Sequence, residues 1–221
     1  KFGYKIKSAI EKALEQVADL IGAHPMEVIF TSCATESNNT AIHAALKANP
    51  NKRHIITSAV EHSSVLNYCM VLETEGYRVT YLPVYREGLL KIADLENAIT
   101  DETAIVSLMW ANNETGVLFP VKDIAEICES RGVLYHCDAV QAAGKVDINL
   151  RTLPINYLSL TAHKFHAPKG IGAVYVKRKT PMTSFIHGGH QERNLRGGTE
   201  SVPLIAGMGK AAELANKTLP G

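Results

Sequence analysis

The chain has 221 residues, of which 46% are hydrophobic and 20% charged. The length is that of one large domain or two small ones, and the composition is that of a globular protein and argues against a disordered chain. The 23 basic and 22 acidic residues leave a net charge of +1, so we expect neither nucleic acid nor a membrane surface as a partner. No apolar run reaches the roughly 18 residues that a spanning helix needs. The first residues lack the pattern of a secretory leader, and we expect a cytosolic or organellar protein.

Cysteine usage points to the same compartment. The four cysteines, at positions 33, 69, 128 and 137, form no C-x-x-C pair, and no histidine lies at zinc-finger spacing from them. In a chain with a core of this size they predict free thiols in a reducing environment. Cys69 and Cys128 fall in helical patterns and are expected to be packing thiols.

Two sequence patterns alternate along the chain, one with the period of a helix and one of short runs rich in β-branched residues. In chain order they predict helix 7–21, strand 27–32, helix 35–49, strand 54–58, helix 63–75, strand 78–83, helix 93–99, strand 103–110, helix 121–131, strands 133–138, 157–161 and 172–176, and helix 202–216. We therefore expect an α/β fold of three layers, α/β/α, in which the middle layer is a mainly parallel, seven-stranded sheet. Ligands of such sheets bind beyond the carboxyl ends of the strands.

The segment after the first strand, residues 33–39, begins a helix with small and hydroxyl residues. Free backbone N–H groups and the positive end of the helix dipole would form a cradle there for a phosphate or carboxylate. The alternative is an ordinary capping box, with Thr35 as the N-cap and Asn38 three residues on. No G-K-[ST] triplet follows, so the segment is not a nucleotide P-loop.

Polar residues follow the next strands too. His62 lies at a strand-to-helix turn, where its ring either stacks on a ligand or merely begins the helix. Asn112 and Asn113 follow a buried run, where unpartnered polar groups are costly, so they indicate a site or a turn. Asp138 ends another buried run, either as a helix cap or as the partner of a cation, and alternation places Cys137 on the opposite face, in the core.

Lys164 follows the sixth strand within segment 161–170, among apolar and ring residues. An amine held in apolar surroundings loses its proton readily, as a Schiff-base lysine must. A surface lysine in a Pro/Gly loop is one alternative. A metal site at His163 and His166 is another, although no further ligands stand at fixed spacing. Segment 188–199, with four glycines and two arginines, is either an anion-binding loop or a linker.

Together these segments offer a phosphate cradle, a stacking ring, a carboxylate for a ring nitrogen and a desolvated lysine, all at one edge of one sheet. Pyridoxal phosphate needs these groups, because it has a phosphate, a ring to stack, a pyridinium nitrogen and an aldehyde for the lysine. The sequence therefore predicts pyridoxal 5'-phosphate as the cofactor.

Six segments carry a family resemblance: FTSCATESNN (30–39), VEHSSV (60–65), MWANNETG (109–116), HCDAVQAAGK (136–145), LTAHKFHAPKG (160–170) and GGHQERNLRGGTE (188–200). In these motifs, which follow in order over essentially the whole chain, the sequence resembles the NifS/IscS group of cysteine desulfurases. The A-H-K-F-H-x-P-K-G and D-A-V-Q motifs are specific. The resemblance implies the large domain of a fold-type I pyridoxal-phosphate enzyme of the class V aminotransferase family.

The resemblance assigns a role to each matching residue. Lys164 looks like the lysine that binds the cofactor aldehyde, and His62 like the histidine that stacks on the ring and can shuttle protons. Asp138 looks like the partner of the pyridinium nitrogen, and Gln141 like the donor to the phenolic oxygen. Asn113 looks like the residue beside the substrate carboxylate. The phosphate ligands implied are Ala34 through its backbone, Thr35, Thr161 and His163, with Thr199 supplied across a homodimer interface.

The activity implied is conversion of L-cysteine to L-alanine. Lys164 or His62 would move the Cα proton, and the sulfur would pass as a persulfide to a sulfur-acceptor or iron–sulfur scaffold protein. The alternatives are a selenocysteine lyase or other class V aminotransferase-like enzyme, and a catalytically inactive fragment that binds the cofactor or dimerises. A dinucleotide-binding domain is disfavoured, because no G-x-G-x-x-G follows a strand.

The chain departs from the family at both ends. It lacks the N-terminal Y-L-D-N-N-A-T-T motif, and it lacks the small C-terminal domain with the persulfide cysteine and an arginine for the substrate carboxylate. We therefore expect residues 1–205 to be the cofactor-binding large domain and residues 206–221 to begin the helix toward the missing domain. Cys33 stands where the family often has glycine and is expected to be a bystander. Ala167 also replaces a common glycine.

Overall fold

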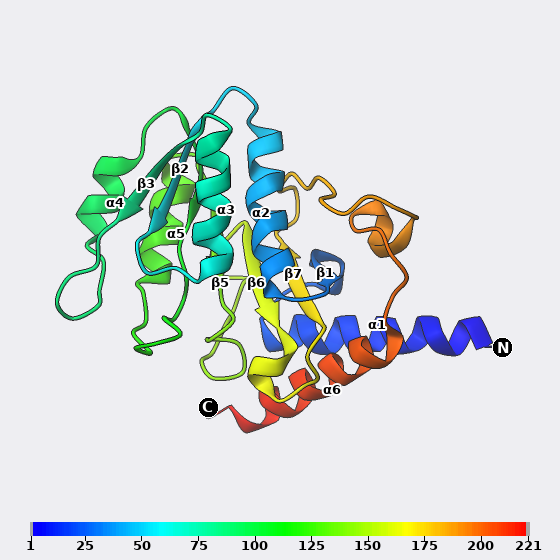
Figure 1. The fold of residues 1–221 in the computed structure, drawn as a ribbon. Helices are drawn as coiled ribbons and strands as arrows, with labels where there is room; N and C mark the ends of the chain where they lie inside the picture. Colours follow the sequence, from blue (N-terminus) through cyan, green and yellow to red (C-terminus); the bar gives the residue numbers. More distant parts are fainter. Residues whose placement is uncertain (1, 220–221) are drawn as a thin grey trace.

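The computed structural model describes residues 2–219, which form a seven-stranded sheet and six α-helices (Figure 1). The helices are α1 (Phe2–Leu20), α2 (Ala34–Ala48), α3 (Ser63–Thr74), α4 (Ile92–Ala98), α5 (Val121–Ser130) and α6 (Val202–Thr218). The strands are β1 (Val28–Thr31), β2 (His54–Ser58), β3 (Arg78–Leu82), β4 (Thr103–Ser107), β5 (Leu134–Asp138), β6 (Tyr157–Thr161) and β7 (Gly172–Val176). Three short 3₁₀ helices are η1 (Pro25–Glu27), η2 (Ala162–Phe165) and η3 (Gln191–Asn194).

Every helix and strand predicted from the sequence is present. The main differences are at two ends, since α1 begins at Phe2 rather than at residue 7, and β4 ends at Ser107 rather than at residue 110. The expected division between residues 205 and 206 falls inside α6 and stays a prediction. The last two residues of the expected segment 206–221 lie outside the described part of the chain.

The strands are arranged in the order β1-β7-β6-β5-β4-β2-β3. Neighbours from β6 through β5, β4 and β2 to β3 are parallel, whereas β7 runs antiparallel to both β6 and β1. Because β7 is antiparallel to both of its neighbours, β1 runs in the same direction as β6. The carboxyl ends of β1, β2, β4, β5 and β6 therefore meet at one edge of the sheet, and the expected mainly parallel sheet is confirmed.

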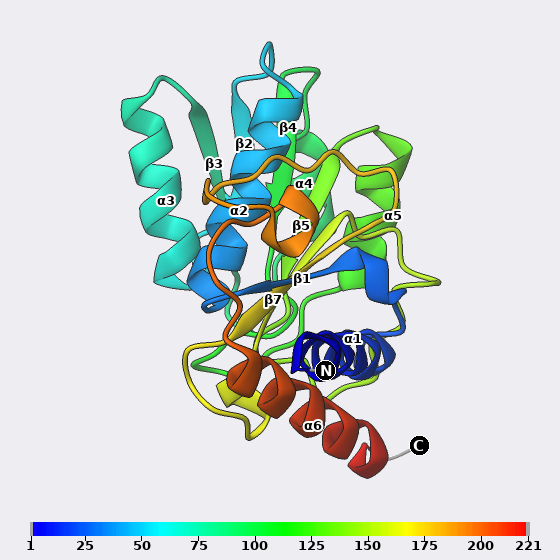
Figure 2. The same ribbon diagram turned by 90° about the vertical axis from the view of Figure 1, so that its right-hand side faces the viewer.

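The sheet is the middle of three layers, because successive side chains of a strand face opposite sides. In β2, Ile55 packs with the cluster under α2 and α3, while Ile56 packs with the cluster under the other four helices. Ile105 and Val106 divide in the same way on β4. Figure 2 shows the two groups of helices on either side of the sheet.

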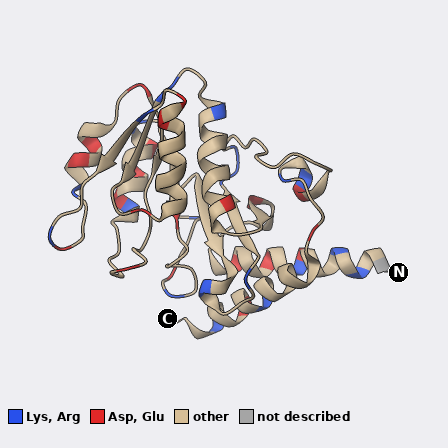
Figure 3. Cartoon of the chain, in the orientation of Figure 1, with Lys and Arg blue, Asp and Glu red and all other residues tan. Residues whose placement is uncertain are grey.

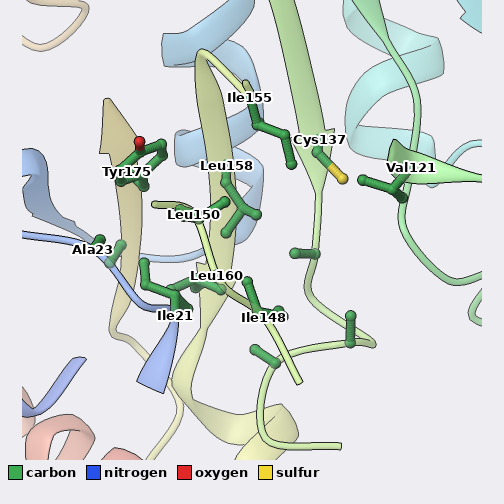
Figure 4. Packing of buried hydrophobic residues seen from close by; sticks show 14 of the residues in the cluster. Ile21, Ala23, Val121, Cys137, Ile148, Leu150, Ile155, Leu158, Leu160 and Tyr175 are labelled. Carbon is green, nitrogen blue, oxygen red and sulfur yellow. The ribbon is translucent and has the colours of Figure 1, made fainter. Parts of the chain in front are cut away.

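The larger of the two cores lies between the sheet and helices α1, α5 and α6. Leu158 and Leu160 of β6 gather there with Ile21 and Tyr175 (Figure 4). Burial of each such side chain contributes about 1.5–3 kcal/mol. Cys137 is fully buried in the same cluster, which confirms its expected place in the core.

The outer edge of β1 is bonded by side chains of η3 instead of by another strand. Glu192 accepts a hydrogen bond from the Phe30 N–H at 3.0 Å, and Arg193 donates to the Val28 carbonyl at 2.7 Å. To reach this position, Glu192 and Arg193 adopt left-handed backbone conformations, with φ of 46° and 58°.

The surface has no dominant charge. Basic and acidic residues are interspersed along the helices and loops (Figure 3), in agreement with the net charge of +1. Within residues 2–219, no helix has the length and apolarity needed to cross a membrane.

Candidate functional site

Nine of the ten site residues predicted from the sequence line one cavity of about 220 Å³. They come from the ends of β1, β2, β4, β5 and β6, as expected for an open sheet. These nine residues are Ala34, Thr35, His62, Asn113, Asp138, Gln141, Thr161, His163 and Lys164. Cys33, Met109, Ala111 and Val140 complete the lining.

Thr199 does not line this cavity. It is exposed and lies in a separate hollow with Glu192 and Arg196. Its predicted role as a phosphate ligand of a partner subunit stays a prediction.

The first turn of α2 forms one wall of the cavity. The N-cap is Cys33, and no side chain caps the helix there, so the capping box with Thr35 as N-cap is wrong. The backbone N–H groups of Ala34 and Thr35 have no acceptor within residues 2–219. Such free groups, together with the helix dipole, attract an anion.

Gly172 makes this wall possible. A Cβ at Gly172 would lie 2.8 Å from the Cys33 carbonyl carbon and 2.8 Å from the Leu160 oxygen. Only glycine therefore lets the loop before α2 pack directly on the start of β7, with the helix N-terminus next to the end of β6.

A partly buried ion pair fixes the same loop. Glu36 accepts hydrogen bonds from the Ser32 N–H at 2.8 Å and from Arg196 Nε at 2.8 Å. Burial raises the pKa of Glu36, but the hydrogen bonds from Arg196 and Ser32 outweigh it and hold the pKa below its usual value. The Glu36 side chain thus binds the loop before its own helix and ties that loop to Arg196. Sequence spacing alone did not indicate this role of Glu36.

Asp138 lies at the base of the cavity and is only 7% exposed. Its Oδ1 accepts from the Val140 N–H at 3.0 Å, and its Oδ2 accepts from Asn38 Nδ2 at 2.8 Å. Burial raises the pKa of Asp138, and the two hydrogen bonds and nearby His62 offset part of that increase. A cation bound in the cavity would stabilise the ionised carboxylate further.

His62 is the N-cap of α3, and its ring is exposed toward the cavity. The Nδ1 atom accepts from the Ser64 N–H at 3.1 Å and lies 2.8 Å from the Ser64 hydroxyl. Capping therefore does not compete with a binding role, because one nitrogen caps the helix and Nε2 has no protein partner within residues 2–219.

Lys164 and His163 lie in η2, directly after β6. Both side chains are exposed at the cavity wall, so the expectation of a lysine buried among apolar residues is wrong for this chain. Burial and the positive charges of Lys164 and Lys169 lower the pKa of His163. Its Nδ1 lies 3.2 Å from the Thr161 hydroxyl. Residues 2–219 contain no cluster of three or more metal-ligating side chains.

The two asparagines after β4 have different environments. Asn112 is buried and holds a turn, because its Oδ1 accepts from the Glu114 and Thr115 N–H groups at 3.0 Å each. Asn113 is exposed at the cavity. In the same cavity lining, the Gln141 amide oxygen accepts from Lys145 at 3.0 Å, which leaves the NH₂ group free to donate.

Three buried polar residues around the site were not predicted from the sequence. Asn38 and Ser64 link Asp138 to His62 by hydrogen bonds. Glu61 is buried beside His62, and burial raises its pKa to about 8. The helical period could have revealed Asn38, since it follows Ala34 by one turn.

The four cysteines are free, as expected. Burial raises the pKa of Cys69 and of Cys128 to about 12, and raises that of Cys137 well above its usual value. Cys69 and Cys128 are fully buried, which confirms that they are packing thiols. Cys33 is half-buried at the cavity wall.

A comparison with known families decides the classification. The family model of class-V aminotransferases matches residues 1–219. The chain belongs to the class V aminotransferase family. Enzymes of this family and the cysteine desulfurases use pyridoxal phosphate, in agreement with the predicted cofactor.

Curated relatives are about 50% identical to the chain over the part of their length that aligns with it. A "Cysteine desulfurase" of Nostoc sp. is 54% identical over 96% of the chain and 53% of its own length. "Cysteine desulfurase NifS" of Azotobacter vinelandii is 49% identical over 97% of the chain and 54% of its own length. The chain thus spans about half the length of these relatives.

A solved structure has the same fold as the chain. One described as "NIFS-LIKE PROTEIN" superposes with a TM-score of 0.95 at 42% identity, covering 98% of the chain and 60% of the other protein. The expected resemblance to NifS-type proteins and the expected fold are confirmed.

The groups in the cavity of this class V chain fit pyridoxal phosphate. The free N–H groups of α2, with the Thr35 and Thr161 hydroxyls, are donors for a phosphate. Asp138 supplies a buried carboxylate for a ring nitrogen, and Lys164 supplies an amine for an aldehyde. The residues present therefore hold a complementary group for each functional part of the cofactor.

Proposed function

We propose that the protein is a pyridoxal-phosphate-dependent cysteine desulfurase that converts L-cysteine to L-alanine and transfers the sulfur to a thiol. One observation carries the proposal, namely that Lys164, Asp138 and the N-terminus of α2 line one cavity. The sequence identities of about 50% to cysteine desulfurases support the same reaction. When bound, pyridoxal phosphate supplies an electron sink for the carbanion that forms at the substrate Cα.

The protein's contribution begins with Asp138. A carboxylate beside a ring nitrogen keeps that nitrogen protonated, and low exposure strengthens the interaction. The Val140 N–H and the Asn38 amide hold the carboxylate in place. The first turn of α2 and the hydroxyls of Thr35 and Thr161 fix the phosphate end.

Lys164 and His62 are the groups that can move a proton at Cα. Both side chains are exposed to the cavity from different elements, η2 and α3. Asn113 lies at the same wall, where its amide can bind the substrate carboxylate. The reaction balances when one thiol accepts the sulfur, because cysteine and a thiol give alanine and a persulfide.

Three of the cysteines are poor candidates for that sulfur acceptor. Nucleophilic attack requires a thiolate, and burial keeps Cys69, Cys128 and Cys137 protonated at neutral pH. We propose that a thiol other than these three accepts the sulfur and passes it to an acceptor or iron–sulfur scaffold protein.

We propose further that the enzyme is a cytoplasmic homodimer in which Thr199 contacts the phosphate in the partner's cavity. The position of Thr199 outside its own cavity supports this proposal. Sedimentation of the purified chain, with and without cofactor, tests it. A monomer at all concentrations would refute the dimer.

The cofactor assignment is tested by chemical trapping. The chain is mixed with pyridoxal phosphate, reduced with borohydride and digested, and the modified peptide is mapped by mass spectrometry. We expect the label on Lys164, because its amine lies at the cavity wall near the phosphate cradle.

Lys169 provides the matched control, since it is an exposed lysine five residues further along the same loop. Lys164→Arg should abolish the specific label, whereas Lys169→Arg should leave it unchanged. Equal labelling of several surface lysines in the folded chain, or no stable adduct, would exclude the proposed site.

A further inference from the structure

A continuous set of hydrogen bonds connects His62 to Asp138 through two side chains outside the cavity lining. Asn38 Nδ2 donates to Asp138 Oδ2 at 2.8 Å and to Ser64 Oγ at 2.9 Å. Ser64 Oγ in turn lies 2.8 Å from His62 Nδ1. Asn38 is fully buried, and Ser64 is 8% exposed, so water does not replace these contacts.

The chemistry of the donors sets the direction of each bond. The ionised Asp138 carboxylate only accepts, so the amide nitrogen of Asn38 must face it. Both hydrogens of that nitrogen are then used, one on Asp138 and one on Ser64 Oγ. The Ser64 hydroxyl therefore accepts from Asn38 and has its own hydrogen free for His62.

His62 Nδ1 consequently faces two donors. One is the Ser64 hydroxyl, and the other is the Ser64 backbone N–H at 3.1 Å. A nitrogen that accepts from both cannot carry a hydrogen itself, so the neutral ring has its hydrogen on Nε2. Nε2 is the atom without a protein partner within residues 2–219, so it is available to the cavity.

We infer that Asn38 and Ser64 are positioning residues that hold the His62 ring in its Nε2–H tautomer and tie its orientation to that of the Asp138 carboxylate. Asn38 is placed for this task by α2, since it lies one turn beyond Ala34, whose N–H group belongs to the proposed phosphate cradle. Helix α2 thus fixes the proposed phosphate cradle directly, and the Asp138 carboxylate and the His62 ring through Asn38. The inference rests on the proposed function only for the roles of His62 and Asp138 in the reaction. The tautomer of His62 does not depend on that function.

The position of Asn38 has an energetic cost that supports a specific role. Its Oδ1 atom is buried without a hydrogen-bond partner among the described residues. A buried acceptor left unpaired is unfavourable. An apolar side chain of similar size would avoid that cost, so the amide nitrogen and its two bonds are what distinguish asparagine at this place.

Nuclear magnetic resonance of ¹⁵N-histidine-labelled chain without cofactor tests the inference, with His62→Gln used to assign the signal. In the wild type we expect the Nε2–H tautomer. Ser64→Ala should lower the ratio of Nε2–H to Nδ1–H about fivefold, the effect of one neutral hydrogen bond, and Ser64→Thr should restore it. An unchanged ratio in Ser64→Ala would overturn the inference.

A second measurement separates positioning from general loss of structure. Asn38→Leu should change the His62 tautomer ratio and also raise the pKa of Asp138, followed by the carboxyl carbon signal, because the Asn38 hydrogen bond lowers that pKa. Ser64→Ala should change only the ratio. If Asn38→Leu does not fold, Asn38→Ala is read in the same way.

Two controls lie on the same helices. Thr40 is buried on α2 and makes no hydrogen bond to these groups, and Ser63 is exposed on α3 beside Ser64. Thr40→Val and Ser63→Ala should change neither signal; if either changes both, the effect is not specific and the inference is refuted. Because no cofactor is present, failure to trap pyridoxal phosphate on Lys164 would reject the proposed function and leave this result standing.

Discussion

Glu61 allows a sharp prediction about stability and pH. Its carboxyl group is buried beside the site, and burial raises its pKa from the usual 4.5 to about 8. The unfolded chain therefore loses this proton near pH 4.5, whereas the folded chain keeps it until about pH 8. Between those values the unfolded state binds fewer protons, so the free energy of unfolding falls as the pH rises.

The size of the effect follows from the two pKa values. At 1.36 kcal/mol per pH unit, ionisation of the unfolded chain lowers the stability of the wild type by about 3 to 4 kcal/mol between pH 5 and pH 8. Glu61→Gln removes this dependence. The Gln oxygen can still accept from the Ser58 hydroxyl, at 2.7 Å, and from the Met109 N–H, at 3.1 Å.

Comparing the free energy of unfolding at two pH values cancels the part of the substitution's cost that does not depend on pH. The Gln NH₂ group would take the place of Glu61 Oε2, which is buried without a partner among the described residues, at a cost of about 1–3 kcal/mol at either pH. Urea denaturation at pH 5 and pH 8, followed by the fluorescence of Trp110, gives both free energies. Relative to the wild type, Glu61→Gln should gain about 3 to 4 kcal/mol over this interval.

Glu96→Gln is the control, because this carboxylate is exposed on α4, and it should follow the wild type at both pH values. A free energy of unfolding that falls as steeply in Glu61→Gln as in the wild type would refute the assignment of a protonated, buried carboxyl group.

Three further substitutions test the core and the site. Gly172→Ala should destabilise the chain by about 1–3 kcal/mol, because the new Cβ would meet backbone atoms at 2.8 Å; an unchanged urea midpoint would contradict the close approach. Leu158→Ala should cost about 2–5 kcal/mol, whereas the half-exposed Leu214→Ala should stay within about 0.5 kcal/mol; similar midpoints for the two variants would contradict the described core. Asp138→Asn should leave Lys164 open to borohydride trapping but weaken cofactor affinity about 10- to 100-fold, the usual effect of losing a hydrogen bond to a charged group; equal affinities in a fluorescence titration would argue against a ring-nitrogen partner at this position.

The sequence predicts the strands well because the sheet is buried on both faces. All five residues of β2, β4, β6 and β7 are buried, so their apolar runs stand out from the amphipathic helices between them. The carboxyl ends of the parallel strands then indicate the site, and nine predicted residues do line one cavity.

The details that sequence analysis missed depend on contacts between distant residues. Glu36 binds Arg196, which is 160 positions away, and this contact, rather than a hydroxyl at Thr35, secures the loop before α2. The exposure of Lys164 depends on which distant segments pack against the end of β6, and the local sequence around Lys164 does not indicate those segments. The spacing predicts Asn38 as part of a capping box, because its actual partners, Ser64 and Asp138, come from other elements.

The bonding of β1 by η3 also bears on how copies of the protein behave toward one another. A bare edge strand is a template on which a second polypeptide can add as a further strand, which leads to aggregation. Glu192 and Arg193 already occupy the Phe30 N–H and the Val28 carbonyl, the groups that such a strand would need. The strained turn of η3 thereby blocks intermolecular strand addition at this edge of the sheet.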